Sequence, residues 1–411
     1  MSYQNFQPEL EAQIAHDLQA HIQSPYRCPD SAVIRRNPHR DMSDRVNRTS
    51  FGRDIDKVLH IPAYNRYTGK TQVFSFRHND DISHRGLHVQ LVARIAKNIS
   101  RLLGLNIELT EAIALAHDLG HTPFGHAGEH ILSDLYQQHT QRYFNHNVHG
   151  VRVLDALYAR NVSLQTLDGV LCHNGEASQK VFRVGDTHDF ETFDALVEQC
   201  YIDQNTIKTL RPSTLEGCVV RISDMIAYVG KDRQDALKTK AIADIQGFTA
   251  GVLGTQNAEI VNNLTVDIVE NSFGKDHIEM SEDAFVSLKR AKAENYEYIY
   301  LSDEQAQTYE NTIRPMFAEL YDALLEDVIN HNESSPIFKH HIEPLDFNHN
   351  IYGAQKPYSQ EEPDTIVVDY LASMTDAYFV ALHEFMFPES PYRITYSGYF
   401  DALHYTRNKH S

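Results

Sequence analysis

The sequence predicts an all-α protein with at most short β-hairpins, on two observations. Apolar residues recur at three- and four-residue steps through most of the chain, which is the period of amphipathic helices. Strand-like alternation is confined to residues 72–76 and 180–184. With 411 residues, of which 42% are hydrophobic, the chain is long and apolar enough for a large core.

The expected elements can be placed in order along the chain. Residues 1–47 are polar, and we expect a short helix there, followed by an irregular N-terminal arm. Residues 87–103 are amphipathic and end at Gly104, whereas the nearly all-apolar stretch 109–119 should be a central, buried helix. Further helical patterns lie at 148–160, 163–173, 215–230, 282–294, 303–332 and 364–386.

The positions of the candidate linkers predict the domain organisation. The two candidate linkers, loops near 174–190 and 333–362, do not divide the chain cleanly. We therefore predict one domain, in which a core at 48–235 is completed by a helical region at 236–411.

Composition narrows the class of protein. The net charge of −19 argues against a general nucleic-acid or membrane surface, because either would need a basic field. No apolar run approaches the ~18 residues that a membrane span needs. The four cysteines show no CxxC spacing and the N-terminus shows no signal-peptide pattern, so we expect reduced thiols and a cytoplasmic protein.

Histidine is the outlier, since ten of the 24 lie between positions 78 and 149. The adjacent His117 and Asp118 supply an imidazole and a carboxylate, ligands that suit Zn, Mn or Fe rather than Ca. Gly120 then ends the helix, and a turn containing Pro123 and Gly125 follows. That turn can return three more side chains to the same point: His121, His126 and Glu129. The alternative is a polar surface turn, which so dense a set of catalytic residue types disfavours.

Two more metal ligands can be sought on neighbouring helices. His88 lies in the first turn of the amphipathic helix, whereas its competitor His84 precedes that helix. Asp224 stands in an otherwise apolar helix, where a carboxylate is costly unless it is paired or bound to a metal. A core salt bridge to Arg221 is the alternative for Asp224.

The helix of Asp224 carries a further pattern. Tyr228 and Asp232 follow at steps of four, so all three side chains stack on one face and can line one wall of a pocket. The hydroxyl and the second carboxylate could hydrogen bond to a sugar. A solvated helix end is the other interpretation of Tyr228 and Asp232.

Together these residues resemble a known family. His88, His117, Asp118 and Asp224 match the H…HD…D pattern of the HD-domain phosphohydrolases. Longer stretches narrow the resemblance to the deoxyguanosine-triphosphate triphosphohydrolase (dGTPase) branch, in order and over about residues 48–380: 48–74, 117–129, 144–152, 167–175 and 369–378. The resemblance implies the helical HD fold with helical elaborations, its catalytic core at 48–235.

The implied reaction is hydrolysis of a dNTP, dGTP first among them, to deoxynucleoside and inorganic triphosphate. The resemblance also implies one divalent metal ion per site; Mn or Mg is expected, and Fe, Co, Ni or Zn is also compatible. It further implies a homo-oligomer, either a hexamer or a tetramer. Nucleic acid as an allosteric ligand stays open. So do two alternatives, an HD phosphohydrolase acting on another nucleotide and a nucleotide-sensing regulator on the same fold.

The resemblance also implies roles for single residues. His126 matches the catalytic histidine that donates a proton to the leaving 5′-oxygen, Glu129 can hold its ring in the active tautomer, and His146 joins this relay. Arg85 matches a phosphate-contacting position, and a protonated His121 can help there. The positions that match sugar and base contacts are Gln72, Val73, Tyr228 and Asp232, with Tyr228 excluding a 2′-hydroxyl.

Some positions depart from the family pattern and leave base preference open: Leu87, Val89, Leu91 and the pair Tyr64–Asn65. Three cations can be either pocket residues or structural ion-pair partners, and the sequence does not decide between these: Arg53, Arg66 and Lys70.

Overall fold

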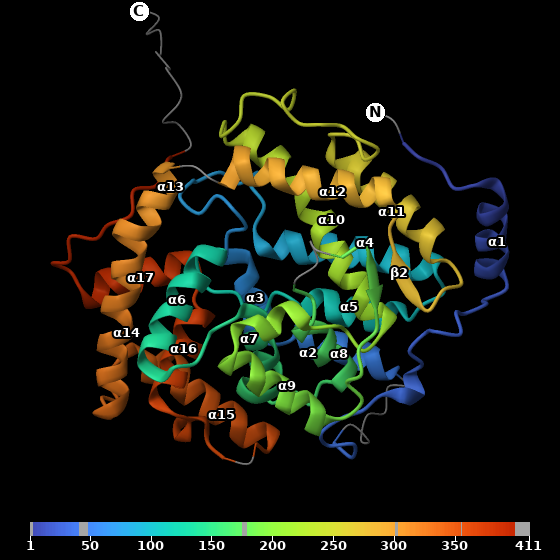
Figure 1. The fold of residues 1–411 in the computed structure, drawn as a ribbon. Helices are drawn as coiled ribbons and strands as arrows, with labels where there is room; N and C mark the ends of the chain where they lie inside the picture. Colours follow the sequence, from blue (N-terminus) through green and yellow to red (C-terminus); the bar gives the residue numbers. More distant parts are fainter. Residues whose placement is uncertain (1–2, 41–47, 175–178, 301–302, 355, 399–411) are drawn as a thin grey trace, which may run out of the picture.

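The structure, a computed structural model, describes residues 3–40, 48–174, 179–300, 303–354 and 356–398. This part of the chain folds almost entirely into helices, and its one sheet pairs two short strands (Figure 1). The predicted all-α class is therefore confirmed. No helix among the described residues combines the length and the apolarity needed to cross a membrane.

Three helices form the centre of the molecule: α4 (Arg85–Leu102), α5 (Ile107–Ala116) and α10 (Leu215–Lys238). The side chain of Asn106 starts α5 by accepting hydrogen bonds from the amides of Glu108 and Leu109. Most of α5 is then buried, because α2 (Ser50–Leu59) and α8 (Leu164–Leu171) cover it. This packing puts the C-terminal end of α5 inside the protein.

A second group of helices stands beside the first. α6 (Gly125–Thr140) packs against α14 (Arg314–Ile329) and α16 (Pro363–Ser373), and α17 (Asp376–Met386) packs on α14 (Figure 1). α7 (His146–Arg152) packs on α8 and continues into a π-helical turn, Val153–Leu157. The C-terminal helices thus lie against the segment that follows the His117–Asp118 pair.

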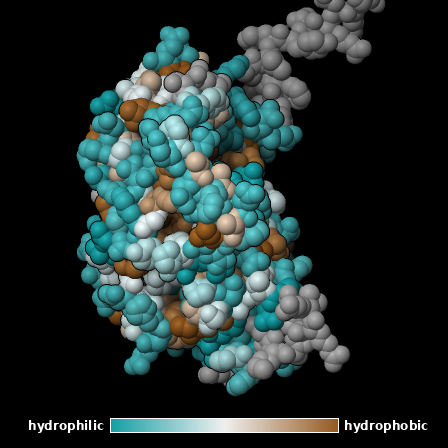
Figure 2. All heavy atoms as spheres, turned by 90° about the vertical axis from the view of Figure 1, so that its right-hand side faces the viewer, coloured by the Kyte–Doolittle hydropathy of each residue, from teal (hydrophilic) through white to brown (hydrophobic). Residues whose placement is uncertain are grey.

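The remaining elements complete the surface. They are α1 (Pro8–Gln19), α3 (Pro62–Arg66), α9 (Phe190–Ile202), α11 (Asn257–Ser272), α12 (Glu282–Asn295), α13 (Asp303–Thr308), α15 (Glu343–Tyr352), β1 (Val181–Arg183) and β2 (His277–Glu279). β1 and β2 are antiparallel, with Phe182 opposite Ile278. On the face that Figure 2 shows, hydrophilic side chains predominate and hydrophobic ones are scattered, in keeping with the net charge of −19.

Several expected boundaries were wrong. Residues 72–76 do not form a strand; their neighbour Thr71 makes only an isolated bridge to His84. A π-helical turn at Tyr309–Ile313 divides the pattern 303–332, and the pattern 364–386 breaks at Thr375, whose side chain caps α17. The expected loop near 333–362 contains α15, and the expected patterns did not include five described helices: α2, α3, α6, α9 and α11.

The turn after α5 is held by close backbone contacts. A Cβ atom on Gly120 would lie 2.0 Å from the carbonyl oxygen of His146 and 2.3 Å from the nitrogen of Gly150, so the turn touches α7 directly. Phe124 (φ 62°) and Gly125 (φ 56°) are both left-handed, and the Phe124 amide donates to Asp376 Oδ1 at 3.0 Å. Tertiary contacts therefore hold a non-glycine residue in a conformation that it rarely adopts.

Gly120→Ala should therefore destabilise the fold. The added methyl group has no space without moving α7, so we expect the free energy of unfolding to fall by about 1–3 kcal/mol in urea titrations. Gly247→Ala is the control, because its Cβ would meet nothing within 4 Å. Equal stabilities for the two variants would contradict the observed contact between the turn and α7.

Candidate metal centre and active site

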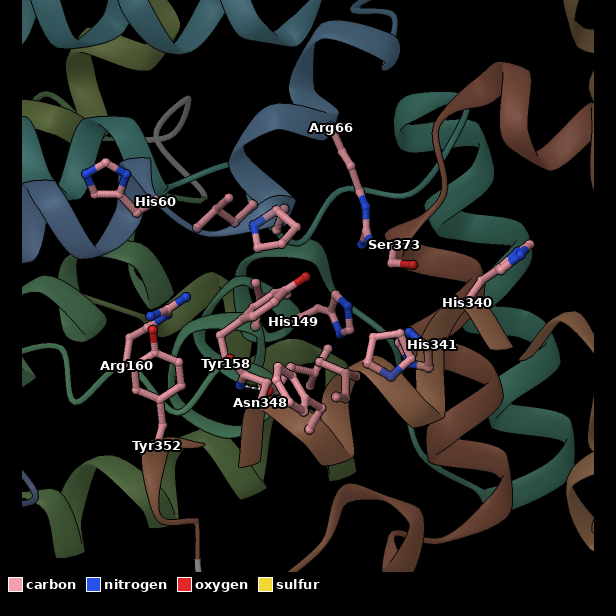
Figure 3. Close-up of a pocket in the computed structure, with 18 of the residues that line it drawn as sticks. His60, Arg66, His149, Tyr158, Arg160, His340, His341, Asn348, Tyr352 and Ser373 are labelled. Carbon is pink, nitrogen blue, oxygen red and sulfur yellow. Dashed lines mark hydrogen bonds between the residues drawn. The ribbon is translucent and has the colours of Figure 1, made fainter. Parts of the chain in front are cut away.

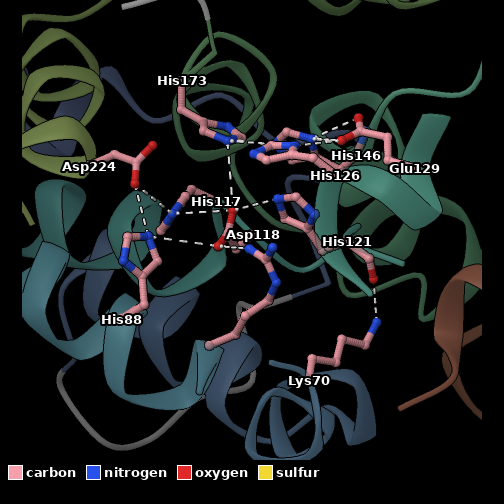
Figure 4. A network of polar contacts seen from close by, with 12 residues as sticks. Lys70, His88, His117, Asp118, His121, His126, Glu129, His146, His173 and Asp224 are labelled. Carbon is pink, nitrogen blue, oxygen red and sulfur yellow. Dashed lines mark hydrogen bonds and ion pairs between the residues drawn. The ribbon is translucent and has the colours of Figure 1, made fainter. Parts of the chain in front are cut away.

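A buried polar cluster surrounds Asp118 (Figure 4). α4 contributes Arg85 and His88, α10 contributes Asp224, and the end of α5 contributes His117. Among the histidines and carboxylates of this cluster, His88 Nε2 and Asp224 Oδ1 lie closest, at 2.9 Å. His117 Nε2 lies 3.4 Å from Asp118 Oδ1 and 3.8 Å from Asp224 Oδ1, and His88 Nε2 lies 3.8 Å from Asp118 Oδ2. The structure thus brings together all four residues that the sequence analysis grouped as metal ligands.

The donor set fits a divalent cation. His117 Nδ1 donates to the Ala114 carbonyl at 2.7 Å, which leaves a lone pair on Nε2, and this buried atom has no hydrogen-bond partner. Two imidazoles and two carboxylates converging in this way are the ligands of Zn, Mn or Fe sites. His84 belongs to none of the groupings of metal-ligand residues in the described chain. Asp224 faces His88, while Arg221 donates to the Leu210 carbonyl.

The carboxylate of Asp118 remains charged although it is buried. Burial alone would raise its pKa, but interactions with the neighbouring His117, His121 and Arg85 hold the pKa well below its usual range. Arg85 donates from one guanidinium nitrogen to Asp118 Oδ2 at 2.7 Å, and its Nε has no partner. Arg85 therefore pairs with Asp118, while its Nε–H group has no acceptor.

A second group of side chains is organised by Glu129. His126 Nδ1 lies 3.0 Å from Glu129 Oε2, and the amide and Nδ1 of His146 both lie 2.8 Å from Glu129 Oε1. Burial alone would raise the pKa of Glu129, but the charge of His146 and hydrogen bonds from both histidines hold it well below its usual range. The ring of His121 stacks on His146 at 3.8 Å. Burial, Arg85 and His146 lower the pKa of His121, which favours its neutral ring over the protonated one that a phosphate contact would use.

Sequence reasoning gave no role to His173, which the structure places inside this cluster. Its side chain is 1% exposed, its Nε2 lies 3.2 Å from His146 Nε2 and 4.0 Å from Asp118 Oδ1, and its Nδ1 donates to the Val170 carbonyl at 2.7 Å. The available signal was a histidine at the end of the helical pattern 163–173, as His117 stands near the end of the pattern 109–119.

The residues matched to substrate contacts lie on the adjoining elements. Gln72 has a buried Oε1 without a partner, and Val73 packs on a small hydrophobic cluster with Phe74. Tyr228 is half-buried on α10, and Asp232, 3% exposed, accepts a hydrogen bond from Tyr300. Burial raises the pKa of Asp232 to about 7. A solvated helix end is therefore excluded for Asp232.

Lys70 and Arg66 both line one cavity, but Lys70 is also hydrogen bonded to two backbone carbonyls. The buried Lys70 ammonium donates to the carbonyls of His121 and Ala372, so it is a structural link. Arg66 lines a cavity of about 370 Å³ between α3, the turn after α7 and α15, which Arg160, His340 and His341 also line (Figure 3). No residue of the four-ligand metal centre lines this cavity.

Comparison with known proteins agrees with this geometry. The HD domain family matches residues 85–228 and the phosphohydrolase-associated domain family matches residues 278–385, which defines the class as HD-domain phosphohydrolase. The chain is 30% identical to a deoxyguanosinetriphosphate triphosphohydrolase-like protein of Caldanaerobacter subterraneus, over 92% of this chain and 96% of that protein. A relative of the same name from Desulfatibacillum aliphaticivorans is 29% identical over 90% and 95%. The chain belongs to this deoxyguanosinetriphosphate triphosphohydrolase-like family.

The geometry predicts different consequences for two neighbouring histidines. His88→Gln should weaken Mn²⁺ binding by about 100-fold or more, since even residues that only support a ligand are worth 10–100-fold. His84→Gln, one turn earlier, should leave the affinity unchanged. Isothermal titration of the metal-free protein measures both, and a stronger effect at His84 would refute the assignment.

Proposed function

We propose that the protein hydrolyses a deoxynucleoside triphosphate, with dGTP the first candidate, to deoxynucleoside and inorganic triphosphate in a reaction that depends on a divalent cation. The observation that carries the proposal is the convergence of His88, His117, Asp118 and Asp224 beside the group organised by Glu129. The names of the relatives, which are dGTPase-like, support the substrate class.

In this proposal a cation, Mn²⁺ or Mg²⁺ first among those compatible, is held by those four residues. When bound, it supplies Lewis-acid polarisation of the phosphate that water attacks. Asp118 is kept ionised by its cationic neighbours, and the carbonyl of Ala114 fixes the His117 ring with its lone pair toward the centre. Asp118 and His117 thus present ligand atoms that carry no proton before a metal ion arrives.

His126 is the proposed proton donor to the leaving 5′-oxygen. Its side chain is 71% exposed, so a substrate can reach it, and Glu129 accepts from its Nδ1 at 3.0 Å. That hydrogen bond fixes the ring and leaves Nε2 to hold and release a proton. His146 shares Glu129 through its own Nδ1 and completes the relay.

Substrate recognition is assigned to the neighbouring polar groups. The unpaired Nε of Arg85 can meet a phosphate oxygen, and the unpaired Oε1 of Gln72 can accept from a sugar hydroxyl. Asp232 shares a face of α10 with Asp224 and Tyr228, which suits a contact to the same sugar. We extend the proposal to a cytoplasmic homo-oligomer, hexamer or tetramer, with a catalytic core at 48–235 completed by residues 236–411.

Product analysis tests the reaction. Purified protein is incubated with each of the four dNTPs and with GTP, in Mn²⁺ or Mg²⁺, and the products are separated by ion-exchange chromatography. We expect deoxynucleoside and inorganic triphosphate, with dGTP turned over fastest. Orthophosphate or pyrophosphate would identify a phosphohydrolase of another specificity, and nucleotide binding without any product would identify a sensor.

Two variants separate chemistry from binding. His126→Ala should retain metal and nucleotide but lose turnover by a factor of about 10²–10⁴, the usual worth of general acid–base catalysis. Asp232→Ala should mainly raise KM, because its sugar contact exists in both ground and transition states. If His126→Ala instead loses its metal or turns over near the original rate, the donor assignment is wrong.

A further inference from the structure

The cavity beside α3, about 370 Å³ in volume, has the turn after α5 in its wall (Figure 3). Leu119 and His149 both line it; Leu119 follows Asp118, and His149 stands about one turn after His146 on α7. Its volume falls within the range of about 300–1,000 Å³ that is typical of small-molecule sites. None of the residues assigned above to the metal, the chemistry or the substrate lines it. The cavity is therefore a separate space that can accept an organic ligand.

The charge of the cavity wall is opposite to that of the whole protein. The wall includes the cationic side chains of Arg66, Lys70 and Arg160, and no aspartate or glutamate of the described residues lines it. The chain as a whole carries 56 acidic residues against 37 lysines and arginines. A positive wall in so acidic a protein favours an anion as the ligand.

Two of these cations have no carboxylate partner. Arg66 and Arg160 form no ion pair within the part of the chain that the structure describes, whereas Arg142 pairs with Glu198 at 2.7 Å. The guanidinium group of Arg160 lies 4.1 Å from the centre of the Tyr352 ring, and its buried Nε has no hydrogen-bond partner. Guanidinium groups with unused donors are well suited to bind an oxyanion.

Arg66 lies near two buried groups of the same wall. The charge of Arg66 acts with burial to lower the pKa of Lys70 to about 7. Burial, together with the charge of Lys70, lowers the pKa of His149 to about 4. His149 is 2% exposed, and its Nε2 has no hydrogen-bond partner. An anion at Arg66 would reduce the repulsion between the two cations, and the unpaired imidazole nitrogen can offer it a hydrogen bond.

Much of the remaining wall is apolar. α15 contributes Leu345, Phe347 and Ile351, and the π-helical turn after α7 contributes Val153 and Leu157. Phe347 is 67% exposed and Ile351 is 58% exposed, and they stand four residues apart on one face of α15. A ligand with an apolar body would remove this surface from water, which stabilises the complex.

We propose that the cavity binds a small organic oxyanion, such as an aliphatic or aromatic carboxylate, whose charged group pairs with Arg66 and whose apolar body lies against Phe347 and Ile351. A nucleoside triphosphate fits less well, because its polar base and sugar would face apolar side chains. Inorganic phosphate would use the arginines but leave the apolar side chains in water. The site involves no metal ion and is independent of the proposed reaction.

A fluorescence titration with 8-anilinonaphthalene-1-sulfonate tests the site, because this aromatic sulfonate brightens when its rings leave water. The full-length protein is titrated in EDTA, so that no metal ion takes part, and we expect saturable binding that approaches one probe per chain. Arg66→Gln should weaken binding by about ten- to a hundredfold, the usual worth of a hydrogen bond to a charged group. Arg94→Gln is the control and should bind as the wild type does, because Arg94 is exposed on α4 and does not line the cavity.

A pair of exposed phenylalanines tests the apolar side of the cavity. Phe347→Ser should weaken probe binding by about tenfold, because it removes apolar contact area. Phe385→Ser should not, because Phe385 is 74% exposed on α17 and lies outside the cavity. Circular dichroism checks that every variant is folded. Equal affinities in the wild type and all four variants, or no saturable binding by the wild type, would overturn the proposed site.

Competition then identifies the class of ligand. Decanoate, inorganic phosphate and dGTP are each added to the complex of protein and probe, still in EDTA. Decanoate should displace the probe at a lower concentration than either of the other two, and any other ranking overturns the assigned class. These measurements need no turnover, so their outcome and that of the product analysis can be told apart.

Discussion

Burial of the Asp118 carboxylate is the constraint on which the rest of the structure depends. An ionised carboxylate in the interior costs several kcal/mol unless charges and hydrogen bonds compensate it. Its compensation comes from separate elements: Arg85 from α4, and His117 and His121 around the end of α5. The helices that form the core must therefore pack as they do for Asp118 to remain charged. The packing that folds the core is thus the same packing that assembles the candidate site.

A second set of bonds links this turn to the C-terminal helices. Asp376, at the start of α17, accepts from the Phe124 amide at 3.0 Å and from the Thr71 hydroxyl at 2.6 Å. Lys70 joins the His121 carbonyl to that of Ala372 near the end of α16. Burial and nearby arginines lower the pKa of Lys70 to about 7. The two carbonyl groups accept hydrogen bonds from its amino group and so hold the side chain in this position. The matched phosphohydrolase-associated region thus supports the turn that carries His121 and His126.

The sequence predicted those site residues that stand out within a short stretch of the chain. His88 and Asp224 interrupt readable helical periods, and the His117–Asp118 pair stands out by density alone. His173 was missed because only the packing of α7 on α8 brings it to His146. The alternation at 72–76 gave a wrong strand prediction, because Phe74 is buried in a small cluster with Ile82 and Ala236 and no strand among the described residues pairs with this segment. The helix break at Thr375 depends on one N-terminal cap, the side chain of Thr375. The apolar pattern continues through this position, so the sequence pattern did not indicate the break.

The candidate site has few positively charged side chains that are free to bind an anion. A triphosphate brings roughly four negative charges, and phosphate recognition normally relies on free Arg or Lys side chains. Here Arg85 already pairs with Asp118, Lys70 is engaged with two carbonyls, and burial with Arg85 and His146 favours a neutral His121. The protein as a whole carries a net charge of −19. In the proposed reaction, positive charge for the triphosphate would therefore come chiefly from the cation held by His88, His117, Asp118 and Asp224.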